Sequence, residues 1–320
     1  MTLSSRLAAV WHALTNNPIS IKELRSRMRG PRAFAVLTIY LLLATGLVVL
    51  IYASYNVNST PTASSSREVG QAVFITMILV QGFLVIFMAP AFTAGAISGE
   101  KERQTYDLLR TTLLSPSAFI LGKLISALSY IFLLLVSAIP LLSLSLMLGG
   151  VAISEVIISQ LMLGTAAILY AMLGLYFSCT LRSTMSASVA TYAVAFFLTI
   201  GTPLLAALFG SIAAGILFSA SSVSSNSLAE AVLTYVGLIL STTNLPASLI
   251  ISDVFLREQN TLWGYTYTVG GYSLWVFSPW YLNVLFHMLL TWFLFRRATR
   301  VVDKIATKQK GDWGLGTNDK

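Results

Sequence analysis

Long apolar runs are the feature that most restricts what this chain can fold into. A helix needs about 20 mostly apolar residues to cross the hydrocarbon core of a bilayer. Six stretches meet that length: Ala33–Ala53, Gln71–Ile97, Ala118–Leu148, Ser154–Cys179, Thr184–Phe218 and Trp275–Phe295. Charged residues make up only 10% of the 320 residues, whereas soluble domains carry about 25%. The sequence therefore predicts an all-α integral membrane protein with six transmembrane helices, in one membrane domain over residues 33–296.

Basic residues predict the topology, because Lys and Arg are enriched in the cytoplasmic loops of membrane proteins. With six spans and a cytoplasmic N-terminus, only Arg67 and Arg257 of the 20 Lys and Arg residues fall on the outer side. We therefore expect a multi-pass protein with both termini in the cytoplasm, and cytoplasmic segments at 1–32 and 297–320. The net charge of +8 then belongs to loops beside anionic lipid, and no nucleic-acid partner is expected.

A seventh apolar stretch, Leu228–Ile251, is interrupted by consecutive polar residues and by Pro246. A seventh full span would place the basic tail on the outer side, against the positive-inside rule. We therefore predict an outer re-entrant hairpin at about 219–270, which is tolerated at membrane depth when it is buried against protein. The alternatives are an outer helix, or a fifth span (Thr184–Phe218) that breaks at Gly201–Pro203 and folds back.

The segment before the first span has the pattern of an amphipathic helix that lies on the membrane surface. Asn17 can cap a helix, and Pro18 suits its first position. Apolar side chains recur at helical spacing at Ile21, Leu24 and Met28. The flanking basic side chains can reach lipid phosphates, and they are Lys22, Arg25, Arg27 and Arg29. The alternative is a disordered basic tail.

The connection between the second and third predicted spans, SGEKERQTYDLLRTTLLSP (Ser98–Pro116), concentrates charge in a chain that has little of it. Arg103 and Asp107 are four residues apart, so they can pair along one helix. Tyr106 and the leucines after it form an apolar stripe at helical spacing. The pattern predicts a short amphipathic helix at about 99–115, and the alternative is a solvated loop. Cytoplasmic retention needs only basic residues, so the acidic ones favour a surface on which a partner docks.

The stretch ISGEKERQTYDLLRTTLLSPSAFILGKLISAL (Ile97–Leu128) resembles the connection between the second and third spans in permease subunits of the type-2 ABC exporter family. The matching features are Gly99-Glu100-Lys101-Glu102, Thr105-Tyr106-Asp107-Leu108-Leu109 and Gly122-Lys123. Residues Asn17–Phe34 are similar to the N-terminal surface helix of many such subunits. Asn244-Leu245-Pro246 is an interrupted version of an Asn-Pro pair that often follows their fifth span.

The resemblance implies an ATP-driven exporter in a bacterial or archaeal plasma membrane. Two permease subunits, identical or different, would pair in the lipid, and each would dock a separate ABC ATPase subunit. The docking residues would be Glu100, Lys101, Glu102, Arg103, Tyr106, Asp107, Leu108 and Leu109. The chain has no G-x-x-x-x-G-K-[ST] loop to cradle ATP phosphates. We therefore expect no cofactor in this chain, with ATP and Mg²⁺ on the partner ATPase.

Gln81 and Tyr192 are the candidates for the translocation path, because they lie on the second and fifth spans, which line the path in the resembling family. The default alternative for each polar group in a span is a hydrogen bond between helices. Integral membrane enzymes and secondary transporters are the competing classes. No catalytic set is predicted, since Ser273 and His287 would stand about 21 Å apart along one helix. One cysteine and two histidines exclude a Cys/His metal cluster.

Overall fold

The computed structural model describes residues 31–58, 63–104, 116–219, 227–258, 261–269 and 272–314. Five helical segments within these ranges are long and apolar enough to cross a membrane: Phe34–Tyr55, Ser66–Glu102, Pro116–Leu148, Ile153–Thr180 and Thr184–Ser211. They coincide with the first five spans predicted from the sequence. The predicted N-terminal surface helix, with Lys22, Arg25, Arg27 and Arg29, lies outside the described residues.

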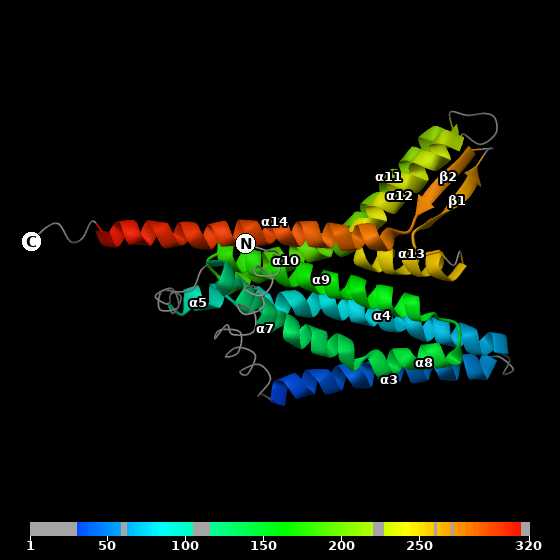
Figure 1. The fold of residues 1–320 in the computed structure, drawn as a ribbon, viewed down its shortest axis with the longest axis horizontal. Helices are drawn as coiled ribbons and strands as arrows, with labels where there is room; N and C mark the ends of the chain where they lie inside the picture. The colour runs from blue at the N-terminus through cyan, green and yellow to red at the C-terminus, as the bar shows by residue number, and fades with distance from the viewer. Residues whose placement is uncertain are drawn as a thin grey trace, which may run out of the picture.

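The first two spans are single long helices that lie side by side, and the third is divided. Helices α3 (Pro31–Asn58) and α4 (Ala63–Thr93) run along the long axis of the molecule (Figure 1), and the short helix α5 (Ser98–Glu102) follows α4. The third span consists of α7 (Pro116–Ser137) and α8 (Ile139–Leu148). Pro140 stands within the first two residues of α8, where a missing backbone N–H costs no helical hydrogen bond.

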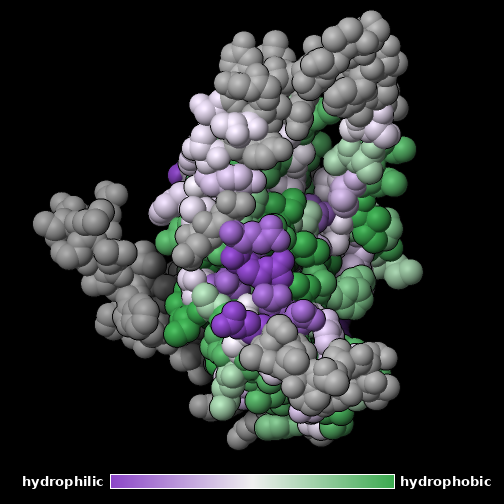
Figure 2. Space-filling view, turned by 90° about the vertical axis from the view of Figure 1, so that its right-hand side faces the viewer, coloured by the Kyte–Doolittle hydropathy of each residue, from purple (hydrophilic) through white to green (hydrophobic). Residues whose placement is uncertain are grey.

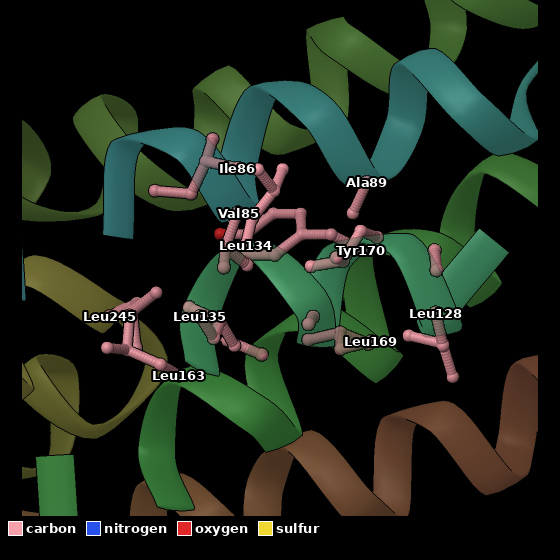
Figure 3. Packing of buried hydrophobic residues seen from close by; sticks show 14 of the residues in the cluster. Val85, Ile86, Ala89, Leu128, Leu134, Leu135, Leu163, Leu169, Tyr170 and Leu245 are labelled. Atoms are coloured by element: carbon pink, nitrogen blue, oxygen red, sulfur yellow. The ribbon is translucent and has the colours of Figure 1, made fainter. Parts of the chain in front are cut away.

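Helix α9 (Ile153–Thr180) is the centre of the bundle and is mostly buried, with α4, α7 and the C-terminal helix packed against it. Figure 3 shows apolar side chains of α4, α7 and α9 that interlock in this core, with Tyr170 among them. Lipid tails are as apolar as these side chains, so close van der Waals packing holds the helices together. At Gly174 the helices α4 and α9 approach so closely that a Cβ atom would overlap Thr93 Oγ1.

The fifth span contains a π-helical turn that divides it. It consists of α10 (Thr184–Phe196), the π-helix η1 (Phe197–Gly201) and α11 (Thr202–Ser219). Figure 1 shows α11 leaving the direction of the bundle and projecting from it as an arm, together with the next helix. The alternative reading of the sequence, a break at Gly201–Pro203, therefore agrees with the position of the π-helix.

The predicted outer hairpin contains two helices, α12 (Ser227–Thr243) and α13 (Leu245–Glu258). Helix α12 packs against α11, whereas α13 packs against α4, α9 and the C-terminal helix. Asn244 forms the apex between them, and its Oδ1 accepts a hydrogen bond from Ala247 N–H at 2.8 Å. Asn at a helix N-cap with Pro in the first turn is a typical helix start.

The sixth predicted span, Trp275–Phe295, begins too early in the sequence. Residues Trp275–Phe277 belong to strand β2 (Tyr272–Phe277), which pairs antiparallel with β1 (Gly264–Val269). Helix α14 begins at Pro279, runs to Gly314 and extends beyond the end of the bundle at which α5 lies (Figure 1). It is not among the five segments that qualify as spans. The chain is predominantly helical as predicted, the β-hairpin is an exception, and the count of six spans is not confirmed.

Candidate functional site

A junction of charged side chains joins α5 to three other helices, and the first contact is with α7. Glu100 Oε1 lies 2.7 Å from Lys123 Nζ. The Lys123 side chain is only 3% exposed and that of Glu100 is 22% exposed. The ammonium also lies 5.4 Å from the centre of the Phe119 ring, on the preceding turn of α7. A charge this deeply buried is stable only with an opposite charge beside it, so Glu100 ties α5 to the start of the third span.

The second contact joins α5 to the C-terminus of α9. Lys101 Nζ donates hydrogen bonds to the carbonyl oxygens of Ser178, Cys179 and Leu181. The last carbonyls of a helix have no partner within that helix, and they carry partial negative charge. Lys101 therefore caps the C-terminus of α9, although it lies about 80 residues earlier in the sequence.

The third contact joins α5 to the N-terminus of α10. The Glu102 carboxylate accepts hydrogen bonds from Thr184 N–H at 2.7 Å and from Thr184 Oγ1 at 3.0 Å. Free backbone N–H groups and the helix dipole both favour an anion at this position. Ser183 precedes it as the N-cap, and its hydroxyl accepts from Ser186 N–H. Glu102 thus adds an acceptor at the start of the fifth span.

Neutral groups complete the junction. The backbone N–H groups of Ile97 and Ser98 both donate to Ser178 Oγ, at 2.8 and 2.9 Å. The two N–H groups lie where the turn after α4 meets the start of α5. The residues Ile97, Ser98 and Ser178 are all buried. The hydroxyl of Ser178 fixes the direction in which α5 leaves α4, because it is held by the central helix.

Helix α5 ends much earlier than the sequence pattern indicates. It stops at Glu102, and Arg103 and Gln104 form an exposed turn in which Gln104 has a φ of 56°. A positive φ is uncommon for a residue with a side chain and interrupts a right-handed helix. The predicted single helix at about 99–115 is therefore wrong in its extent. The remaining docking candidates, Tyr106, Asp107, Leu108 and Leu109, lie outside the described residues.

An apolar groove of about 450 Å³ lies between the second and fifth spans. Its walls are α4, α10 and η1, with Pro246 of α13 at one side. Several of the lining aromatic rings are exposed, among them Phe83, Phe87 and Phe196. Ligand sites in helical membrane proteins are concave and mostly apolar, so this groove is the candidate translocation surface.

Tyr192 and Gln81 occupy different places relative to this groove. Tyr192 lines it, and its hydroxyl donates to the Phe87 carbonyl oxygen at 2.9 Å. Gln81 is fully buried, where its Oε1 accepts from Gln160 Nε2 at 2.7 Å and its Nε2 donates to the Leu135 carbonyl oxygen. Gln81 of α4 thus forms hydrogen bonds to α7 and α9. This agrees with the alternative prediction that polar groups in the spans bond between helices.

Asn244 links the apex of the helical hairpin to the divided fifth span. Its Nδ2 donates to the carbonyl oxygens of Leu198 and Thr199, at 2.9 and 2.7 Å. A π-helix shifts the backbone hydrogen-bonding pattern. Here the side-chain amide of Asn244, at the apex between α12 and α13, contacts two carbonyl groups of the π-helix. A π-helical turn in a span often marks a functional site, and this one lines the groove through Thr199 and Ile200.

The five long apolar helices, with the buried helix α9 at their centre, are those of a multi-pass membrane protein. The model of the ABC-2 family transporter proteins matches residues 17–294. The chain therefore belongs to the ABC-2 transporter family, and it is a permease component of an ABC transporter. Membership of this family implies an ATPase partner. A comparison with curated proteins returned no match.

Four residues that make contacts in the junction or beside the groove were not predicted to do so from the sequence. Ser178 and Thr184 are polar residues at helix ends, a position that indicates capping but does not identify a partner about 80 residues away. Asn244 was noted only as part of a motif, although an Asn two residues before a Pro is a recognisable helix start. Lys123 was noted only in the Gly122-Lys123 feature, and its ion pair with Glu100 was not predicted.

Proposed function

We propose that this chain is the membrane subunit of an ATP-driven exporter, in which two permease subunits pair and each docks a separate ATPase subunit. The observation that carries the proposal is the junction at α5, where Glu100, Lys101 and Glu102 contact α7, α9 and α10. A displacement of α5 would move the ends of three spans together. Such an arrangement suits the transmission of force from a docked ATPase to the transmembrane helices.

The contacts divide the predicted docking residues into two groups. Glu100, Lys101 and Glu102 are engaged within the chain, so their role in the proposal is to make the junction rigid. Arg103 is exposed, and it begins the stretch that would contact the ATPase. Tyr106 and Asp107 to Leu109 complete that contact surface in the proposal, with apolar contact from the aromatic and leucine side chains and orientation from the charges.

The groove between α4 and α10 is the proposed translocation surface, with Tyr192 on its wall and Gln81 in the packing behind it. Two such grooves would face each other across a pair of subunits, identical or different. The lining is almost entirely apolar, which suits a lipid-like or amphipathic substrate. The hairpin apex at Asn244 would be the inner end of a re-entrant segment that closes the groove toward the outer side, because it contacts the middle of the fifth span.

The proposed orientation places α5 and both termini in the cytoplasm of a bacterium or archaeon, and export is the proposed direction. The sixth crossing would be the apolar part of α14, which packs along α9. Basic residues follow this part of α14, at Arg296, Arg297 and Arg300. The positive-inside rule supports a cytoplasmic location for them.

Co-purification with an ABC ATPase tests this function. The tagged chain is co-expressed in turn with ABC ATPase subunits from the same genome, and both bound ATPase and ATP hydrolysis are measured in lipid nanodiscs. The double variant Glu100→Ala/Glu102→Ala is expected to insert normally and to lose at least half of the ATP hydrolysis that depends on the permease. Glu258→Ala, at the opposite end of the bundle, is the matched control. Normal ATPase binding and hydrolysis in the double variant would count against the proposed role of α5.

A further inference from the structure

Two acidic side chains are buried together at the end of the bundle opposite to α5. Glu155 lies in the first turn of α9 and Asp253 lies in α13, and they are only 5% and 6% exposed. They are close enough to repel each other electrostatically. Figure 2 looks onto this end of the molecule and shows a hydrophilic patch with apolar surface beside it. Buried carboxylates are costly unless they are paired or bind a cation.

Helix capping accounts for only part of the Glu155 side chain. Its carboxylate accepts a hydrogen bond from the backbone N–H of Ala152, the N-cap residue of α9. A Glu at the third helical position commonly makes this bond. Its other oxygen, Oε2, is buried and has no hydrogen-bond partner among the described residues. One oxygen of a buried carboxylate is therefore left for a further ligand.

A small cavity supplies the space for that ligand. Both carboxyl groups line it, together with Ser159 and Ser252, and its volume is about 10 Å³. That volume holds about one water-sized particle. Ser252 is 2% exposed, and its Oγ likewise has no hydrogen-bond partner among the described residues. Four residues with oxygen-bearing side chains thus line a space for one small particle, and the other lining residues are apolar.

The nearest basic side chain is directed to other partners. Arg257 lies one turn after Asp253, and its Nη1 donates to Gln71 Oε1 at 3.1 Å. Its Nη2 lies 3.6 Å from Glu258 Oε1 at the more exposed end of α13. Gln71 Nε2 in turn donates to the Gly150 carbonyl oxygen at 3.2 Å. These contacts hold the guanidinium beside the carboxylates, where its charge offsets one of them without occupying the cavity.

A wider pocket lies next to the cavity. It has a volume of about 540 Å³ and is lined by the loop before α9, by Arg257 and by Leu262. Glu155 and Leu256 line both the pocket and the small cavity. The small cavity therefore lies next to a larger pocket, and the Glu155 residue borders both.

We propose that Glu155, Asp253, Ser159 and Ser252 form a binding site for one small monovalent cation, either Na⁺ or a proton held by a water molecule. Two carboxylates and the Arg257 guanidinium leave one negative charge, which a monovalent cation neutralises. A divalent ion would need six or more oxygen ligands, several of them waters, and the cavity has no room for those waters. The cation removes the repulsion between Glu155 and Asp253 and joins α9 to α13.

Other charged groups near the site are few in the described part of the chain. Helix α13 contributes Asp253, Arg257 and Glu258, and α9 contributes Glu155. Helix α4 faces them with the neutral Gln71, and Arg67 and Glu68 lie one turn before it. Any response of the site to pH must therefore be separated from that of Glu258, which lies at the surface.

Thermal unfolding of the full chain in nanodiscs tests the site. The melting temperature is measured in NaCl and in choline chloride at equal ionic strength, and in choline chloride between pH 8 and pH 6. The variants are Glu155→Gln, which retains the capping acceptor, Asp253→Asn, and Glu258→Gln as the control outside the cavity. Calorimetric titration of the unmodified chain with NaCl gives a measure of binding that does not depend on the folding of any variant.

A ligand that binds only the folded state raises the melting temperature as its concentration rises. We expect Na⁺ to raise it by a few degrees in the unmodified chain and in Glu258→Gln, and by less than half as much in the two cavity variants. A rise on lowering the pH without Na⁺, lost in the same two variants, identifies the proton as the cation. The proposal is overturned if neither cation separates the cavity variants from Glu258→Gln and calorimetry detects no Na⁺ binding.

Discussion

Substitution of the two glutamates of α5 should affect stability to different degrees. Glu100 contacts a buried lysine, whereas Glu102 contacts an exposed helix N-terminus. Glu100→Ala removes the carboxylate that lies 2.7 Å from a Lys side chain with 3% exposure. Removing one partner of a buried ion pair costs about 3–5 kcal/mol. Glu102→Ala removes an acceptor at the exposed N-terminus of α10, and such a cap contributes about 0.5–2 kcal/mol.

Chemical unfolding of the purified chain in mixed micelles measures both free energies. We expect Glu100→Ala to lower the free energy of unfolding by roughly 2 kcal/mol more than Glu102→Ala. The double variant Glu100→Ala/Lys123→Met should recover at least half of that loss, because it removes the buried charge as well. Equal losses for the two glutamate variants, or no recovery in the double variant, would refute this account of the junction.

Three further substitutions test the packing and the caps. Gly174→Ala should lower the free energy of unfolding by about 1–3 kcal/mol, because its Cβ atom would overlap Thr93. The control is Gly46→Ala, at which a Cβ atom meets nothing within 4 Å, and it should leave the free energy of unfolding nearly unchanged. Lys101→Met should cost about 1–3 kcal/mol and should speed amide hydrogen exchange in the last turn of α9, and unchanged exchange there would contradict the capping role. Asn244→Ala should lower the free energy of unfolding by about 1–3 kcal/mol and should speed amide hydrogen exchange at Ala247, whose N–H donates to the Asn244 side chain. A stable variant with unchanged exchange at Ala247 would argue against the apex contact.

The sequence predicts the first five spans well, because apolar length is a property of each segment by itself. The β-hairpin was missed for the same reason. Residues Tyr272–Phe277 form an apolar run next to a longer one, and a short apolar run does not distinguish strand from helix. Their partner strand, Gly264–Val269, is separated from them by two residues in the sequence, and the strand becomes evident only from the pairing.

The candidate site was predicted in composition but not in arrangement. The motif Gly99-Glu100-Lys101-Glu102 drew attention to the segment in which the charged junction lies, and its charges were interpreted as groups that face a partner protein. In the structure all three charged residues contact other helices of the same chain. Their partners lie 23 to 82 positions away in sequence, so spacing within the motif holds no information about them. Arg103 is the one charged residue of the adjoining turn, and it is exposed.

The most direct test of the proposed mechanism is a distance measured across the pair of subunits while the ATPase binds nucleotide. Spin labels are attached at Phe196→Cys, an exposed position at the end of α10, in a Cys179→Ala background that removes the single buried cysteine. Pulsed electron paramagnetic resonance of the assembled transporter then gives the distance between the two labels. If α5 transmits the motion, a non-hydrolysable ATP analogue shifts this distance, and Glu102→Ala reduces the shift while the ATPase stays bound. An identical shift in the variant would contradict the account.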